Sequence, residues 1–228
     1  MREDFQIRKT SAGIVLAVIT PLLLLLSNVY LLATPAFIRY EYGRPSFPPP
    51  ARYSAAERVS LAEQTLHYMR SSEGVDYLTN LQSCGRAVYN VREIRHLVDA
   101  KLVMRGAFSV HGICALLCCL AALLFWRHRQ EWPGALQAVY LGCAGLVVVL
   151  LGIGILVYAN FGLFFTIFHR LLFEGDSWLF AFSDTLIQLF PVQFWMDATW
   201  LLALLTAGEC TIVGAAAYVL ARRLEAAQ

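Results

Sequence analysis

Residues 135–158 read ALQAVYLGCAGLVVVLLGIGILVY, a stretch without a charged side chain that is long enough to cross a bilayer as a helix. Comparable apolar runs occupy residues 12–34, 106–126 and 198–220. Of the 228 residues in the chain, 58% are hydrophobic and only 15% are charged. This balance excludes a soluble domain and predicts an all-α integral membrane protein with four transmembrane helices.

The chain is expected to alternate between membrane spans and outer segments. Residues 1–34 are the N-terminal transmembrane helix, and residues 35–105 are an extracytoplasmic helical loop that leads into the second span. Residues 106–159 contain the second and third spans with a short charged turn between them. Residues 160–198 are an extracytoplasmic, interfacial segment rich in aromatic residues, and residues 199–228 are the fourth span and a tail. The two extracytoplasmic segments are predicted to form a cap with interfacial helices.

Basic residues in the short segments predict the orientation of the protein. They lie before the first span, between the second and third, and after the fourth: Arg2, Arg8, Lys9, Arg127, Arg129, Arg222 and Arg223. By contrast, residues 160–197 contain Arg170 as their single Lys or Arg. Both termini and the short turn are therefore expected in the cytoplasm, with the two larger segments on the opposite side.

Three helices are expected in the outer segments. Residues 54–57 read SAAE, the pattern of a capping box that opens a helix to about Met69. A second helix is expected to start near Gly85 and to run through His96 into the next span. Residues 183–191 begin with Ser-Asp and end at proline, which predicts a short interfacial helix.

The first candidate functional stretch is residues 164–173, FFTIFHRLLF, where His169 and Arg170 stand in an otherwise mostly aromatic and aliphatic run. Holding a titratable ring against apolar groups at a membrane boundary is costly, and such residues are functional candidates. The alternative is that both residues mark the polar side of an interfacial helix.

The second stretch is residues 91–101, VREIRHLVDAK. On a helix, Arg92, His96 and Asp99 share one face, with Glu93 on its rim. A carboxylate near an imidazole can hold its tautomer, orient the ring and raise its pKa. The alternative is a solvated charged helix that leads into the membrane. Because both stretches end at the outer interface, their imidazoles are expected to meet at the mouth of the bundle.

The remaining polar residues predict no cofactor. His111 lies inside the second span, where an interhelical hydrogen bond is favoured over haem ligation. Five of the six cysteines lie inside apolar runs, which gives neither a disulfide framework nor a zinc site. The net charge of +2 and the scattered basic residues do not suggest a nucleic-acid surface.

The chain resembles the bacterial lipoprotein intramolecular transacylase (Lit) family in Glu93-x-x-His96-x-x-Asp99, in Phe168-His169-x-x-x-Phe173-x-x-Asp176-x-Trp178 and in Asp184-x-Leu186-Ile187-x-x-x-Pro191. The resemblance covers most of the chain, and it is specific in the two histidine stretches and loose in the spans. One departure is Ala181-Phe182, where an Asp-Pro pair is expected. The resemblance implies an enzyme of the bacterial plasma membrane. It would move the sn-2 acyl chain of a diacylglyceryl-cysteine lipoprotein to the α-amine of that cysteine, giving the N-acyl-S-monoacylglyceryl (lyso) form.

The chemistry of ester aminolysis assigns roles to these residues. His96 and His169 are predicted to be the acid/base pair, one taking a proton from the amine and the other supporting the oxyanion or protonating the released oxygen. Glu93 or Asp99 is expected to orient His96, and Arg92 to bind a carbonyl or balance that carboxylate. The expected acyl-groove residues are Phe165, Phe168, Phe173 and Trp178. Ester and amine belong to one molecule, so the effective molarity is high and neither a metal nor a cofactor is required.

Other functions also fit the composition. A four-helix redox protein would use His96, His111 and His169 to bind haem or quinone, and a non-catalytic partner of an envelope enzyme would need neither outer histidine. A metal-dependent hydrolase is a third alternative. For the transacylase, the expected partners are a diacylglyceryl-modified lipoprotein and membrane lipid.

Overall fold

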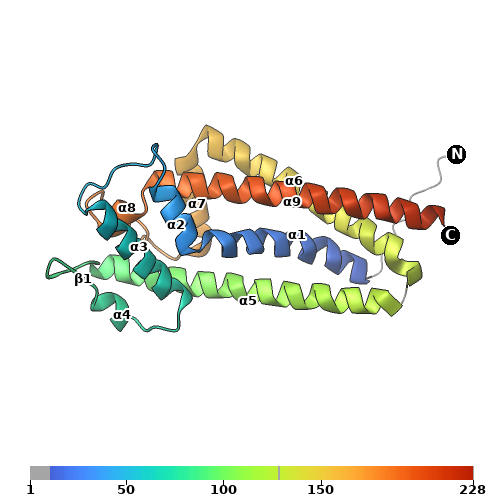
Figure 1. Cartoon of the computed structure of the whole chain (residues 1–228), viewed down its shortest axis with the longest axis horizontal. Helices are drawn as coiled ribbons and strands as arrows, with labels where there is room; N and C mark the ends of the chain where they lie inside the picture. Colours follow the sequence, from blue (N-terminus) through green and yellow to red (C-terminus); the bar gives the residue numbers. More distant parts are fainter. Residues whose placement is uncertain (1–10, 128, 228) are drawn as a thin grey trace. The chain divides into compact units, whose positions relative to one another are not determined.

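The computed structural model describes residues 11–127 and 129–227 (Figure 1). Four helices are long and apolar enough to cross a membrane: α1 (Ser11–Leu32), α5 (Val91–Arg127), α6 (Trp132–Ala159) and α9 (Val192–Ala226). They match the four predicted spans, so the prediction of an all-α integral membrane protein is confirmed. Three basic residues behind the predicted orientation, Arg2, Arg8 and Lys9, lie outside the described residues, and that orientation stays a prediction.

The shorter elements are α2 (Pro35–Tyr42), α3 (Ala55–Arg70), α4 (Asp76–Thr79), α7 (Phe161–Leu172), α8 (Thr185–Leu189), a 3₁₀ turn η1 (Arg129–Glu131) and the strands β1 (Gln82–Ser83) and β2 (Arg86–Ala87). The chain divides into two compact units. The bundle unit comprises the chain up to Val29, Ser109–Ile155 and the chain from Leu202, and the cap unit comprises Tyr30–Phe108 and Leu156–Leu201.

In the bundle unit, apolar packing is supplemented by polar contacts between helices. Leu16 and Ile19 of α1 pack with Cys114 of α5 and Ala135 of α6. The Asn28 side chain is 2% exposed, and its Nδ2 donates to Glu209 Oε2 on α9 at 2.7 Å. Such bonds tie helices together where water is absent.

His111 makes the interhelical hydrogen bond that the sequence favoured. Its Nε2 lies 3.0 Å from Ser27 Oγ, which joins α5 to α1. Outward-facing apolar side chains of the same unit stay exposed, including Val148 and Ile212, as expected for helices that face lipid.

In the cap unit, the helix predicted from the capping box is present as α3. Ser54 Oγ accepts a hydrogen bond from the Glu57 amide at 3.2 Å. The predicted helix over residues 183–191 is present as α8, which ends before Pro191. The cap core consists mainly of large apolar residues from α3 to α8: Tyr53, Leu61, Tyr68, Leu78, Val88, Tyr89, Leu97, Leu186 and Leu189.

Two parts of the cap differ from the sequence prediction. Helix α5 begins at Val91 rather than near Gly85, because Cys84 and Gly85 both have positive φ and turn the chain between β1 and β2. Helix α2 was not anticipated. It begins with Pro35 after the N-cap Thr34, whose side chain accepts from the Phe37 amide.

Gly142 marks the closest approach of α6 to α1. A Cβ built at this position would overlap the backbone carbonyl of Ala17, whereas a Cβ at Gly145 would meet nothing within 4 Å. Backbone atoms cannot rotate away as a flexible side chain can, so a methyl group at Gly142 must push the two helices apart.

We therefore expect Gly142→Ala to destabilise the protein by about 1–3 kcal/mol, the usual cost of overpacking. The matched variant Gly145→Ala should melt at or slightly above the wild-type temperature, because alanine favours the helix. Thermal unfolding in detergent, followed by circular dichroism, measures both. Equal melting temperatures for the two variants would contradict the close helix contact.

Candidate active site

His169 is held in a buried, aromatic environment near the C-terminal end of α7. The residue is 7% exposed, and its Nδ1 lies 2.7 Å from the Phe165 carbonyl oxygen. Because a carbonyl oxygen only accepts hydrogen bonds, Nδ1 carries the proton, and the neutral ring keeps its lone pair on Nε2. Burial lowers the pKa of His169 below its ordinary value, and the bond to Phe165 only partly opposes this shift. His169 is therefore a neutral imidazole of defined tautomer at pH 7.

His96 lies beside this ring although the two residues are far apart in sequence. The ring centroids are 6.0 Å apart and the planes are inclined by 23°. His96 is also enclosed by Phe173 and Phe180, at centroid distances of 4.8 Å and 5.3 Å. The structure thus brings together the two imidazoles that the sequence placed at a common mouth.

The aromatic residues expected around the histidines form most of this enclosure. Centroid distances from His169 are 4.0 Å to Phe165, 4.9 Å to Trp178 and 5.5 Å to Phe173. Phe165, His169 and Phe173 follow one another at intervals of four residues, which places them along one side of α7 and its C-cap. Phe168 also contacts His169 but is 43% exposed.

Phe180 was missed by the sequence analysis. Its position two residues after Trp178, in a segment rich in aromatic residues, could have marked it as part of the enclosure.

Glu93, which was expected to orient His96, makes its hydrogen bonds to backbone amides. The residue is 1% exposed, and its two carboxylate oxygens accept hydrogen bonds from the backbone amides of Asn90 at 2.8 Å and Leu186 at 2.7 Å. Asn90 Oδ1 in turn accepts from the Glu93 amide at 3.1 Å, which completes a reciprocal cap at the start of α5. Glu93 therefore joins the first turns of α5 and α8.

Asp99, the other carboxylate that was expected to orient His96, makes no hydrogen bond to it among the described residues. Among the described residues, His96 Nδ1 is buried without a hydrogen-bond partner, so no carboxylate holds the ring through this atom. Arg92 Nη1 donates to the Leu179 carbonyl at 3.1 Å, which fixes the segment that covers the histidines. Asp99 lines a neighbouring cleft.

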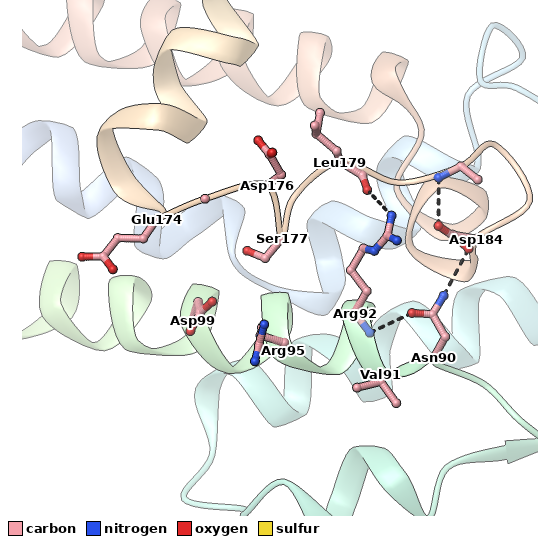
Figure 2. Close-up of a pocket in the computed structure, with 12 residues that line it drawn as sticks. Asn90, Val91, Arg92, Arg95, Asp99, Glu174, Asp176, Ser177, Leu179 and Asp184 are labelled. Atoms are coloured by element: carbon pink, nitrogen blue, oxygen red, sulfur yellow. Dashed lines mark hydrogen bonds between the residues drawn. The ribbon is translucent and has the colours of Figure 1, made fainter.

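This cleft has a volume of about 1080 Å³ and lies between α5 and the segment after α7 (Figure 2). Its lining residues are Asn90, Val91, Arg92, Arg95, Asp99, Glu174, Gly175, Asp176, Ser177, Leu179, Ala181 and Asp184. In the described part of the chain, no group of three or more His, Cys, Asp or Glu side chains is arranged to hold a metal ion. The chemistry that this region offers is proton transfer by paired imidazoles in an apolar enclosure.

Comparison with known proteins identifies relatives over most of the chain. The family model for the lipoprotein intramolecular transacylase Lit matches residues 14–195. A relative from Aquifex aeolicus (strain VF5), described as an uncharacterized protein, is 29% identical over 197 residues, covering 85% of this chain and 87% of the relative.

Two solved structures share the fold. The membrane integral lipoprotein intramolecular transacylase Lit from Bacillus cereus is 17% identical, with 94% of both chains covered and a TM-score of 0.60. A histidine-to-alanine variant of that protein is 19% identical, with a TM-score of 0.59 over 92% of this chain and 91% of that one. The likeness therefore covers both units of the chain.

The role of Glu93 predicts a loss of stability in Glu93→Gln. An amide has a single acceptor oxygen, so one of the two backbone amides loses its partner at a cost of about 1–3 kcal/mol. Thermal unfolding in detergent should show a lower melting temperature for this variant. Glu73→Gln, which changes an exposed carboxylate of the same unit, should melt like the wild type. A wild-type melting temperature for Glu93→Gln would refute the bridging role.

Proposed function

The chain belongs to the lipoprotein intramolecular transacylase (Lit) family, and we propose that it moves the sn-2 acyl chain of a diacylglyceryl-cysteine lipoprotein to the α-amine of that cysteine. The product is the N-acyl-S-monoacylglyceryl lipoprotein. The observation that carries this proposal is the pair of imidazoles, 6.0 Å apart, inside an aromatic enclosure. One ester and one amine of the same substrate molecule fit such a pair, because one ring can then move the proton while the other supports the oxyanion.

In this mechanism, His169 is the general base. Its Nδ1 proton is engaged by Phe165, so Nε2 is the nitrogen that accepts a proton from the amine as the C–N bond forms at the ester carbonyl. An N–H of His96 supports the oxyanion of the tetrahedral intermediate. When the ester C–O bond breaks, the His169 imidazolium returns its proton to the sn-2 oxygen. The proton moves from nitrogen to oxygen within the substrate, and no co-reactant is consumed.

The aromatic enclosure favours transfer over hydrolysis. Phe173 and Trp178 pack against His169, and Phe173 and Phe180 pack against His96, so bulk water has little access to the rings. Excluding water protects an ester from the competing nucleophile. The same apolar side chains suit the acyl chain that is transferred. We further propose that both termini are cytoplasmic and that the histidine pair lies at the extracytoplasmic face of a bacterial plasma membrane.

Co-expression with a lipoprotein tests the reaction directly. Mass spectrometry of the lipoprotein N-terminus should show one acyl chain moved from oxygen to nitrogen with no change in mass, whereas hydrolysis would remove that chain. His169→Gln should lower the rate by about 10²–10⁴-fold, the usual contribution of a general acid or base. His96→Gln should lower it by about 10²–10³-fold, the usual contribution of one oxyanion donor. His67→Gln, an exposed histidine on α3, is the matched control. Wild-type rates in folded His169→Gln protein would exclude this residue as the base.

The lowered pKa of His169 predicts the pH dependence of kcat/KM. From about pH 8 downwards, the rate should fall only with the neutral fraction of the α-amine. A second, steeper fall in kcat/KM should begin only below about pH 6.5, where His169 becomes protonated. Its lowered pKa keeps the His169 imidazole neutral at the pH values where an ordinary histidine starts to take up a proton. Kinetics with a synthetic diacylglyceryl lipopeptide measure this profile. A second fall that begins above the ordinary pKa of histidine would contradict the assignment.

A further inference from the structure

The cleft and the histidine pair are built from the same two segments. Helix α5 contributes His96 to the pair and Arg95 and Asp99 to the cleft. The segment after α7 contributes Phe173, Trp178 and Phe180 to the enclosure, and Glu174, Asp176 and Ser177 to the cleft. Figure 2 shows Asp99 and Arg95 on α5, below the segment that carries the three polar residues. The cleft and the histidine pair are therefore neighbours on the same two segments.

Some cleft residues form hydrogen bonds between the two segments that line the cleft. Arg92 binds the Leu179 carbonyl, and Asp184 accepts from the Ala181 amide at 2.8 Å and from Asn90 Nδ2 at 3.1 Å. These bonds connect the start of α5 to the segment that precedes α8. The cleft walls are thus fixed by contacts within the protein.

Other side chains of the cleft make no hydrogen bond or ion pair with the rest of the described protein. Within residues 11–127 and 129–227, no ion pair or side-chain hydrogen bond engages Arg95, Asp99, Glu174 or Asp176. Ser177 Oγ is buried and lacks a partner among the same residues. Three carboxylates and one guanidinium thus remain for a ligand, which leaves an excess of negative charge.

We propose that this cleft binds the polypeptide that follows the lipidated cysteine, and that it prefers basic or uncharged residues there over acidic ones. The inference rests on the proposed function, because the substrate joins its ester and its peptide through one cysteine. The volume of about 1080 Å³ is at the upper end of ligand sites and accommodates a short extended peptide. The free polar groups pair with the backbone and side chains of the peptide, while the aromatic enclosure takes the apolar half of the substrate.

Kinetics with three synthetic diacylglyceryl lipopeptides test this preference. The peptides differ only in the three residues after the cysteine, which are all Lys, all Ser or all Glu. With the wild-type enzyme in a neutral detergent, KM should be about three- to tenfold lower for the Lys peptide than for the Glu peptide, and the ratio should shrink at high salt. The value of kcat should change little, because the peptide lies outside the reacting atoms.

The double variant Glu174→Gln/Asp176→Asn should reduce the KM ratio between the Lys and Glu peptides towards one. Glu73→Gln/Asp76→Asn, which removes two exposed carboxylates of the same unit outside the cleft, should keep the wild-type ratio. The change in net charge is the same in both, so a difference between them assigns the effect to the cleft.

Equal KM values for the three peptides in the wild type, or equal ratios in the two double variants, would overturn the cleft proposal. Such results would leave the transacylase intact, because they presuppose acyl transfer. If the enzyme transferred the acyl chain in none of the three peptides, the proposed function would be overturned instead.

Discussion

The arrangement of the cap depends on a buried carboxylate that is shared between two helix starts. Glu93 accepts from the amide of Asn90, the residue just before α5, and from the Leu186 amide in α8. A buried acceptor of this kind is costly to leave unpaired, so the two helices are held at one relative position. His96 is one turn further along α5, and the segment that ends at α8 supplies Phe173, Trp178 and Phe180. One carboxylate thereby sets the distance between a histidine and the residues that enclose it.

The aromatic enclosure of the histidines costs free energy because it removes water from their rings. Burial of His169 and partial burial of His96 remove much of their hydration, and the neutral form of His169 is favoured as a result. In the transacylase mechanism, neutral imidazole is the form that accepts a proton from an amine. In that proposed mechanism, the desolvation that costs stability in the cap keeps His169 in the form that accepts the proton. Arg92 and Asp184 stabilise the same segment from the cleft side through backbone carbonyl and amide groups.

Features with a local cause were predictable from the sequence, and features with a distant cause were not. The spans follow from apolar length, α3 from the capping pattern at Ser54, and α8 from the Ser183-Asp184 pair and Pro191, although Asp184 makes no side-chain cap hydrogen bond. The meeting of the histidines followed from placing both stretches at one interface. The partner of Glu93 could not be predicted, because Leu186 is far along the chain and offers only its backbone amide. The start of α5 was misplaced because Cys84, with φ of 50°, is a residue type that does not signal a left-handed turn.

His169 has no carboxylate among its ring contacts or hydrogen-bond partners in the described residues, unlike a histidine in a catalytic triad. Its place in the last turn of α7 supplies a substitute. The unpaired carbonyls at a helix C-terminus carry partial negative charge, and the Phe165 carbonyl already faces the ring. If His169 takes up a proton, as the proposed mechanism requires, the backbone dipoles would act as its counter-ion. A base of this kind would need no permanent anion beside it, and it would avoid the repulsion between such an anion and the oxyanion of the proposed intermediate.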